Sequence, residues 1–197
     1  MTDTLPGAVT GTANDDYARM IDALRGFLDQ LSSARPSPAL LREMETTLSR
    51  WSGDLDLVQV AEDEREFGRR VDLPGRGQVM SPWLRLDAVS ETEVSGTLRF
   101  GRYFLGKNGA IHGGAVPLVL DEVLGRAASM AAPALARTAY LHVNFRSITP
   151  ADRDLRVTAR IVSVSGRKRL VTGEVYDGSR LCCDAEGLFV ELLPGQQ

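Results

Sequence analysis

The first third of the chain shows two apolar stripes at helical spacing. In residues 17–31 apolar side chains recur three or four positions apart, just after Asn14 and Asp15, which are suited to start a helix. A second stripe follows Ser37 and Pro38, a helix cap with proline at the first helical position. The pattern predicts an amphipathic helical hairpin, and such stripes are far more typical of packing surfaces than of cofactor sites. The stripes consist of Tyr17, Met20, Ile21, Leu24, Leu28 and Leu31, and of Leu40, Leu41, Met44, Leu48 and Trp51.

The segments on either side of this hairpin have irregular patterns. Residues 1–14 are small and polar and contain glycine, so we expect a mobile tail there. Residues 52–78 are rich in charged residues, which predicts an irregular charged linker with residues 55–61 as a candidate short element. Residues 15–78 are therefore interpreted as an N-terminal helical extension and linker.

After residue 78 the pattern changes to that of strands. Residues 155–165 alternate clearly, with Leu155, Val157 and Ala159 on one face. The alternation predicts an antiparallel sheet with a buried face. The expected strands lie within residues 79–89, 92–101, 138–148, 155–165, 169–178 and 179–192.

A single helical segment, about residues 114–131 and ended by Pro133, lies between the second and third strands. Its apolar residues occur on nearly every side, which is the pattern of a helix enclosed by a curved sheet and little exposed to solvent. The order of two strands, a helix and four strands predicts an α+β domain of residues 79–193. A chain of 197 residues suffices for one such domain and an appendage.

Unusual chemistry lies at the start of this helix, in "GAIHGGAVPLVLDEV" (residues 109–123). Pro117 has no backbone N–H and clashes inside a helix, so the helix is expected to begin at residues 114–116. The free N–H groups of its first turn then lie in the His-Gly-Gly segment, where they and the helix dipole favour a negative charge or a polarised carbonyl oxygen. The two glycines leave room for a ligand to approach the backbone.

The motif ends in two acidic residues with different surroundings. Glu122 lies four residues before Arg126 on the same helix face, which predicts an ion pair. Asp121 has no such local partner, because its neighbours three and four residues away are apolar residues or glycine. An unpaired buried carboxylate is costly, so Asp121 either meets a partner from elsewhere or serves in chemistry.

Composition narrows the choice of partners and compartment. A net charge of −3 and 25% charged residues give no sign of a nucleic-acid-binding face. No stretch approaches the roughly 20 apolar residues of a membrane span, and the start of the chain lacks the features of a signal peptide. Cys182 and Cys183 are adjacent and point to opposite faces of a strand, so we expect free thiols and a cytoplasmic protein.

The segment "HGGAVPLVLDE" resembles the helix start of the hot-dog thioesterases, in particular the phenylacetate-pathway and hydroxybenzoyl-CoA thioesterase branch. In that branch an acidic residue follows the histidine by nine positions, and that position here is Asp121. Residues 138–146 ("TAYLHVNFR") are similar to the family's third strand, and residues 162–177 ("VSVSGRKRLVTGEVYD") to its following hairpin. The resemblance covers about residues 79–193 and implies a hot-dog fold, an antiparallel sheet wrapped around one long helix.

The resemblance also implies an acyl-CoA thioesterase with active sites at the interface of a homodimer or a dimer of dimers, and without a metal or other cofactor. Asp121 would act as general base or nucleophile. The Gly114 N–H would bind the carbonyl oxygen, with Gly113 contacting the substrate. His112 would orient the thioester or, alternatively, serve as a capping or packing residue. Thr138 would hold the attacking water across the dimer interface, or be an ordinary strand threonine.

One departure from the family pattern concerns a polar residue about six positions before the histidine, where this chain has Gly106. Asn108 is interpreted either as its replacement on a shorter loop or as a turn residue. Arg167 and Lys168 lie where relatives offer basic groups to the phosphates of coenzyme A, and a solvated basic turn is the alternative.

Three functions follow from these patterns. The first is hydrolysis of an acyl-CoA, or of an acyl-carrier-protein thioester, to the free acid and thiol. The second is a non-catalytic hot-dog module that binds acyl-CoA or serves in assembly, against which the presence of Asp121 argues. The third is a hot-dog hydratase or dehydratase, which is disfavoured because those relatives space their acid and histidine pairs differently, and Arg126 lies five residues after Asp121 here.

Overall fold

The computed structural model describes residues 16–90, 92–130, 136–193 and 195–196. The chain divides into two units, residues 1–78 and 79–197. Three expectations from the sequence fall outside the described residues: the mobile tail, the helix start at Asn14 and Asp15, and the helix stop at Pro133. No helix of the described part of the chain is long and apolar enough to cross a membrane.

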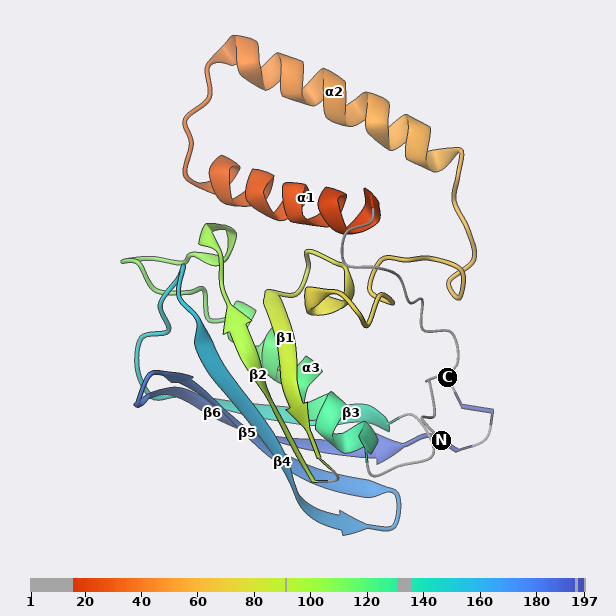
Figure 1. Cartoon of the computed structure of the whole chain (residues 1–197), viewed down its shortest axis with the longest axis vertical. Coiled ribbons are helices and arrows are strands. Elements are labelled where there is room, and N and C mark those ends of the chain that lie inside the picture. The colour runs from red at the N-terminus through yellow and green to blue at the C-terminus, as the bar shows by residue number, and fades with distance from the viewer. Residues whose placement is uncertain (1–15, 91, 131–135, 194, 197) are drawn as a thin grey trace. The chain divides into compact units, whose positions relative to one another are not determined.

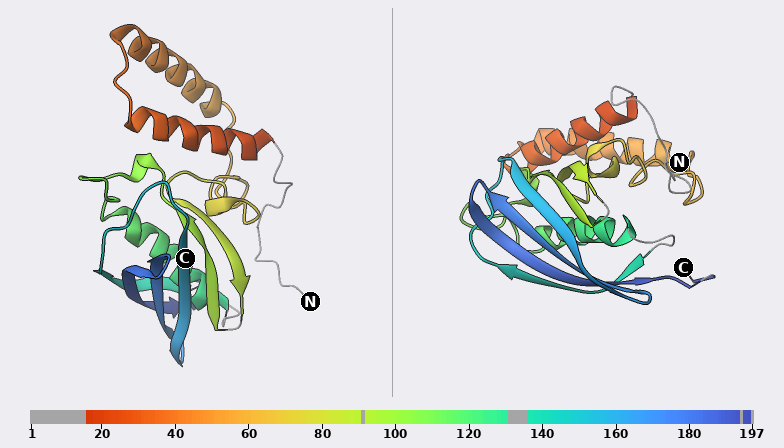
Figure 2. Two further views of the ribbon diagram at one scale, coloured as in Figure 1. Left: turned by 60° about the vertical axis from the view of Figure 1, so that its left-hand side comes forward. Right: turned by 60° about the horizontal axis from the view of Figure 1, so that its bottom comes forward.

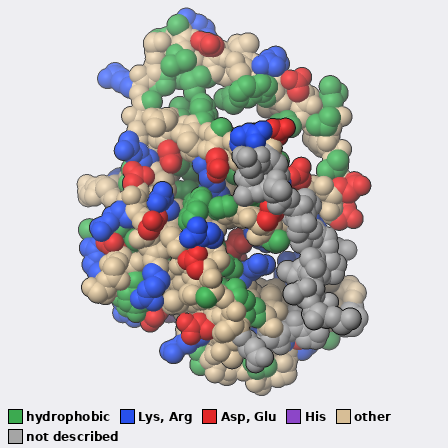
Figure 3. All heavy atoms as spheres, in the orientation of Figure 1, with side chains coloured by type: hydrophobic (Ala, Val, Ile, Leu, Met, Phe, Trp, Pro, Cys, Tyr) green, Lys and Arg blue, Asp and Glu red, His purple; other side chains and the backbone are tan. Residues whose placement is uncertain are grey.

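The first unit contains the predicted helical hairpin, α1 (Asp16–Ser32) and α2 (Pro38–Asp56). Ser37 caps α2, because its Oγ accepts a hydrogen bond from the Leu40 N–H at 3.3 Å. α2 runs several residues into the predicted linker, since a lone Gly53 costs a helix only about 1 kcal/mol. Figure 3 shows apolar side chains along both helices at the molecular surface.

The segment after α2 is largely irregular, as predicted, and its first part is exposed. It contains a short 3-10 helix, η1 (Pro74–Arg76), and a buried Arg70 side chain that is 1% exposed. Arg70 forms salt bridges with Asp72 at 2.8 Å and with Glu66 at 3.0 Å. Its guanidinium also lies 5.7 Å from the ring centre of Tyr17 in α1. Arg70 is therefore paired within this segment and packs it against α1.

The second unit is a six-stranded antiparallel sheet that curves around one helix (Figures 1 and 2). Its elements are β1 (Trp83–Val89), β2 (Glu93–Arg99), the 3-10 helix η2 (Arg102–Phe104), α3 (Ala115–Met130), β3 (Ala136–Phe145), β4 (Leu155–Ser165), β5 (Lys168–Asp177) and β6 (Arg180–Glu191). The chain order of two strands, a long helix and four strands is the predicted one. In space the strands follow the order β1-β2-β4-β5-β6-β3, so β1 and β3 form the two edges of the sheet.

The core lies between α3 and the concave face of the sheet. The alternating residues of β4 point inward as predicted, and Leu155, Val157 and Ala159 are buried. α3 approaches the sheet so closely that a Cβ at Gly173 of β5 would lie 2.5 Å from Leu124 Cδ1. Burial of each large apolar side chain stabilises the fold by roughly 1.5–3 kcal/mol. The buried residues of α3 are Ala115, Val116, Val119, Leu120, Val123, Leu124, Ala127 and Ala128.

One face of α3 contradicts the prediction that solvent reaches little of this helix. Leu118 is 41% exposed, and Asp121 is exposed as well. The strand order gives the reason: the sheet ends at β3, and no further strand among the described residues covers this side of α3.

Cys182 and Cys183 are free, as predicted, and both are buried. Their side chains point to opposite faces of β6, but the segment after β3 covers Cys182. The N–H groups of Arg146 and Ser147 in that segment donate to the Cys182 carbonyl at 2.9 and 3.0 Å. Burial raises the pKa of the Cys183 thiol to about 12.

Candidate active site

The segment before α3 is held by backbone hydrogen bonds on both sides. The His112 N–H donates to the Phe104 carbonyl at 2.8 Å, and the Ile111 N–H donates to the Thr149 carbonyl at 3.0 Å. A Cβ at Gly106 would lie 3.2 Å from the Cα of His112. The polar side chain that relatives carry six residues before the histidine therefore has little room in this loop.

Asn108 and Gly109 form the tip of the loop. Their φ angles are positive, 56° and 74°, and the Ala110 N–H donates to the Lys107 carbonyl at 3.2 Å. Asn-Gly with two positive φ angles is the signature of a type I′ turn. The structure gives Asn108 a turn role, and its assignment as a catalytic residue stays a prediction.

His112 caps α3, which begins within the range predicted from Pro117. The Gly114 N–H donates to His112 Nδ1 at 3.0 Å, and the Ala115 N–H donates to the His112 carbonyl at 2.9 Å. The contact with Gly114 is compatible with capping, and the role of His112 towards a thioester stays a prediction. The N–H that the sequence assigned to the carbonyl oxygen, that of Gly114, is thus occupied by the imidazole.

Gly113 offers an open donor beside it. Its N–H has no hydrogen-bond partner among the described residues, and the residue is exposed. A Cβ at this position would lie 3.7 Å from the ring of Phe145, so the ring borders the space in front of the N–H. An oxygen that enters this space meets the positive end of the α3 dipole.

Phe145 is a neighbour of the site that sequence reasoning missed. It ends β3 and is 57% exposed. The only signal was its place in the Asn-aromatic-basic step of residues 144–146. Nothing in that step indicates contact with the His-Gly-Gly segment, because the contact depends on how β3 passes the start of α3.

Asp121 has the partner that its own helix does not supply. Thr138 Oγ1 donates a hydrogen bond to Asp121 Oδ1 at 2.7 Å, across 17 residues of sequence. The register of β3 against β6 shifts between Thr138 and Tyr140, and such bulges re-aim the side chains beside them. The contact lies within one chain, whereas the sequence placed Thr138 across a dimer interface. Oδ2 of Asp121 has no hydrogen-bond partner in the described part of the chain.

The ion pair expected between Glu122 and Arg126 stays a prediction. Both side chains are half-buried, and a pair at this spacing stabilises a helix by about 0.2–0.5 kcal/mol.

The candidate residues form two groups near opposite ends of β3. His112, Gly113 and Gly114 lie by Phe145, at the end of the strand, whereas Asp121 meets Thr138 near its start. Asp121 follows the first residue of α3 by six positions, which is about 9 Å along the helix axis. A carbonyl bond is only about 1.2 Å long, and its two atoms need donor and base within about 3 Å. The two groups of one chain therefore do not both contact one carbonyl directly.

Arg167 and Lys168 are exposed in the hairpin between β4 and β5. Arg167 Nη1 donates to the Glu191 carbonyl at 2.9 Å. The registers of β5 with β6 and of β6 with β3 place this hairpin at the end of the sheet where Thr138 lies. Arg167 and Lys168 thus lie at the end of the sheet where Thr138 contacts the Asp121 carboxylate.

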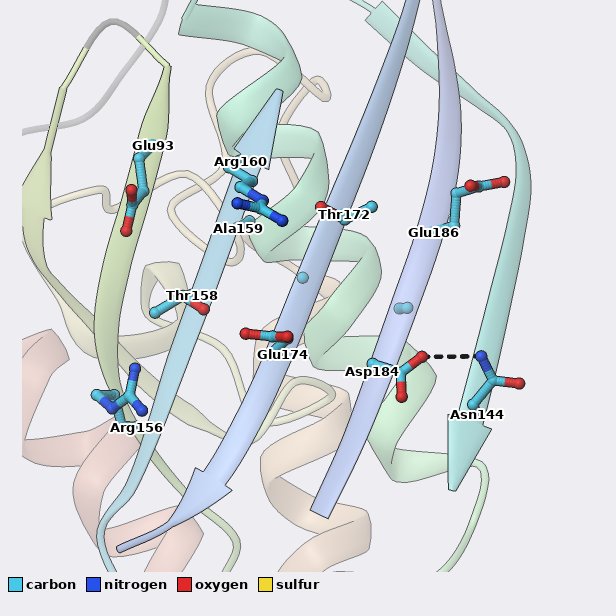
Figure 4. A pocket seen from close by; sticks show the side chains of 12 residues that line it. Glu93, Asn144, Arg156, Thr158, Ala159, Arg160, Thr172, Glu174, Asp184 and Glu186 are labelled. Carbon is cyan, nitrogen blue, oxygen red and sulfur yellow. Dashed lines mark hydrogen bonds between the residues drawn. The ribbon is translucent and has the colours of Figure 1, made fainter. Parts of the chain in front are cut away.

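A groove of about 700 Å³ lies on the convex face of the sheet. Figure 4 shows its polar side chains, with α3 on the other side of the strands. It includes none of the predicted site residues and is distinct from the two groups above. Among the described residues, no cluster of three or more His, Cys, Asp or Glu side chains is placed to bind a metal ion. The lining residues are Glu93, Asn144, Arg156, Thr158, Ala159, Arg160, Thr172, Gly173, Glu174, Asp184, Ala185 and Glu186.

Residues 108–183 match the thioesterase superfamily. A curated relative, acyl-coenzyme A thioesterase THEM4 of Bos taurus, is 31% identical over 96 residues, which are 48% of this chain and 39% of that protein. The match thus spans well under half the length of this relative.

Solved structures share the fold. A thioesterase superfamily protein superposes with a TM-score of 0.77 at 29% identity, covering 92% of this chain and 98% of its own. A Streptococcus mutans protein solved with acetyl-CoA bound superposes with a TM-score of 0.53 at 16% identity, covering 55% of this chain and 88% of its own. The sheet around α3 is therefore a hot-dog fold, and this chain is similar to thioesterase superfamily proteins in sequence and in fold.

Proposed function

We propose that residues 79–197 form an acyl-CoA thioesterase, which hydrolyses an acyl-CoA to the free acid and coenzyme A. The observation that carries this proposal is the exposed Asp121 carboxylate, which Thr138 holds at one oxygen on the side of α3 that the sheet leaves open. A carboxylate in this setting activates a water as general base or attacks the thioester carbon itself. Neither route uses a metal or a further cofactor.

Gly113, rather than Gly114, is the oxyanion donor in this proposal. The Gly113 N–H has no partner within the described residues, whereas the Gly114 N–H is bonded to His112. His112 then supports the reaction by fixing the first turn of α3, which aims the neighbouring N–H. A single preorganised donor of this kind contributes about 10²–10³ in kcat.

The Asp121 carboxylate and the Gly113 N–H reach the same thioester when two copies of the domain pair along β3. As an edge strand, β3 has one side with backbone groups unpaired in the sheet. When two such strands pair antiparallel about a two-fold axis, the start of one lies beside the end of the other. Asp121 and Thr138 of one chain then meet the partner subunit's Gly113. A homodimer, or two such dimers, is therefore part of the proposal.

Coenzyme A is the proposed thiol of the substrate. The matched Bos taurus protein is an acyl-coenzyme A thioesterase, and the Streptococcus mutans neighbour binds acetyl-CoA. Arg167 and Lys168 lie at the Asp121 end of the sheet, where their charges suit the phosphates of coenzyme A.

Thiol release from acyl-CoAs of varied chain length and aromaticity tests the reaction. We expect turnover by the wild type and a fall in kcat of about 10²–10⁴ in Asp121→Asn and Asp121→Ala. Thr138→Ser keeps the hydroxyl and serves as the matched control for Thr138→Ala, which we expect to lose part of the activity. Coenzyme A binding without turnover on any substrate would leave the non-catalytic module as the function, and turnover that survives both Asp121 variants would remove Asp121 from the chemistry.

A single turnover in ¹⁸O-water separates the two roles of Asp121. If the carboxylate attacks the thioester, water opens the resulting anhydride and the label is able to enter the protein at Asp121. If the carboxylate activates water, the label enters only the released acid. Mass spectrometry of the peptide that contains Asp121 distinguishes the two routes.

A further inference from the structure

The apolar stripe of α2 is exposed along most of its length, with Met44 half-buried. α2 has no buried residue, and its apolar side chains follow a spacing of three, four, three and four residues. This spacing is that of a helix which packs along a seam with other helices. Exposed fractions reach 43% for Leu48, 51% for Trp51 and 66% for Leu55. The seam consists of Leu41, Met44, Leu48, Trp51 and Leu55.

α1 has a similar seam beside the face that its own unit covers. Ala18 and Ile21 are buried, whereas Met20 and Leu31 are 47% and 38% exposed. The seam consists of Met20, Leu24, Phe27 and Leu31, spaced four, three and four residues apart. α1 and α2 are not among the closely contacting pairs of elements, and Figure 1 shows them side by side. Leu24, Phe27 and Met44 are half-buried and the other seam residues are exposed, so neither seam is fully covered within one chain.

We propose that the α1–α2 hairpins of two copies of this chain associate into a four-helix bundle, in which the two seams of each copy are buried by the other. This interface goes beyond the proposed thioesterase function and uses no residue of the proposed active site. It is also separate from the pairing along β3, because it is built entirely from residues 16–56.

The size of the two seams fits a protein interface. Helices of 17 and 19 residues, at 1.5 Å per residue and about 10 Å wide, present roughly 500 Å² per chain. Two copies then bury about 1,000 Å², which is the lower bound of a specific interface. An apolar patch of this extent is in the range of the largest patch on a typical monomer, and such patches are often functional.

Charge favours a second copy over a lipid surface. Helices that lie on anionic membranes carry Lys and Arg on their polar face. α2 has two basic and four acidic residues, a balance of −2, so its polar face is repelled by such a surface. These residues are Arg42, Arg50, Glu43, Glu45, Asp54 and Asp56.

The hairpin also recurs without being needed for the hot-dog fold. The thioesterase superfamily structure that covers 92% of this chain extends beyond residues 79–197 into the N-terminal unit. The Streptococcus mutans protein has the same fold with 55% coverage. The hairpin is thus an addition to the hot-dog fold. A role in assembly would not require any change in the fold of the second unit.

Sedimentation velocity of the full-length chain over a dilution series tests the bundle. The test variant is Leu48→Glu with Trp51→Glu, and the matched control is Thr46→Glu with Ser49→Glu, which adds the same charges on the opposite face of α2. We expect the association step that depends on the hairpins to require a concentration at least about tenfold higher in the test variant than in the wild type. Pairing along β3 should be unchanged, and the control should behave as the wild type. Far-UV circular dichroism should be equal in all three, because Leu48 and Trp51 are already exposed in the single chain.

Spin labels at Ser49→Cys report the proximity of two hairpins directly. The native thiols are buried, so labelling is confined to the new cysteine. We expect an interchain distance that disappears on mixing with excess unlabelled chain and in the Leu48→Glu, Trp51→Glu variant. The inference would be overturned if that variant sedimented as the wild type does, or if no interchain distance were observed. It would also be overturned if the seams caused binding to vesicles of phosphatidylcholine and phosphatidylserine in place of self-association. Thiol release by the same variant then shows whether the thioesterase proposal stands independently.

Discussion

The His112 ring influences the site by accepting a hydrogen bond from the backbone at the start of α3. The Gly114 N–H donates to His112 Nδ1, and without this acceptor the first turn of α3 loses a cap. We expect His112→Ala to lower the free energy of unfolding by about 1 kcal/mol and kcat by at least about tenfold, since the Gly113 N–H is then less firmly aimed. Urea titration and thiol release measure the two effects.

His112→Asn is the control for this substitution. Its carboxamide oxygen lies close to the position of Nδ1 and accepts the same hydrogen bond, so we expect most of the stability and activity to return. Equal losses in the alanine and asparagine variants would assign the ring to substrate contact instead of capping.

Cys183 gives a prediction from its burial. The pKa of its thiol is raised from 9.0 to about 12, chiefly by desolvation. The folded chain therefore keeps a proton that the unfolded chain releases, so the stability linked to this group is present below pH 9 and is lost as the pH rises from about 9 towards 12. We expect iodoacetamide at pH 8 to modify neither cysteine of the native chain and both in urea, as counted by mass spectrometry. Rapid modification of native Cys183 would contradict its burial.

The site shows where residue-level reasoning from sequence ends. Helical spacing alone identified Asp121 as a carboxylate without a local partner. Its actual partner, Thr138, is 17 residues away on another element, so the pairing depends on how β3 packs against α3. The choice between Gly113 and Gly114 depends on the conformation of the His112 side chain, which a sequence pattern does not encode.

At the scale of elements, features that depend on consecutive residues were predicted better than features that depend on contacts between distant segments. Pro117 limits where α3 starts and the alternation of residues 155–165 defines β4, because both follow from the chemistry of consecutive residues. The burial of Arg70 and its pairing with Glu66 and Asp72 were not predicted, since they depend on how this segment folds back on itself and on Tyr17 of α1. The exposed face of α3 was missed for a similar reason, as it results from the order of strands in the sheet.

Gly173 tests how closely α3 packs on the sheet. A Cβ there would lie 2.5 Å from Leu124 Cδ1 and 2.9 Å from the Thr158 carbonyl oxygen, so we expect Gly173→Ala to lower the free energy of unfolding by about 1–3 kcal/mol. Gly53→Ala is the control, because nothing lies within 4 Å of a Cβ there and alanine favours the helix by about 0.5–1 kcal/mol. Chemical denaturation measures both, and a neutral Gly173→Ala would contradict the close approach of helix and sheet.

At the scale of the whole molecule, the proposed site is shared between two chains. An Asp121→Asn chain lacks the carboxylate, and a His112→Ala chain lacks the cap beside the oxyanion donor. A mixed dimer concentrates both defects in one site and leaves the other intact. We expect equal, randomly assorted mixtures of the two variants to recover about one quarter of wild-type activity.

Each variant unfolded and refolded alone is the control for this mixing experiment, with thiol release as the readout. An activity of the mixture no higher than the average of the two variants would show that each chain builds its site by itself.

If the site is shared between two chains as proposed, a lone folded chain does not bring the Asp121 carboxylate and the Gly113 N–H to one thioester. Turnover in a cell would then depend on how many chains are paired. At abundances below the dissociation constant for pairing, doubling expression would raise turnover about fourfold. Under this proposal, a small rise in synthesis would increase the total activity more steeply than the amount of protein.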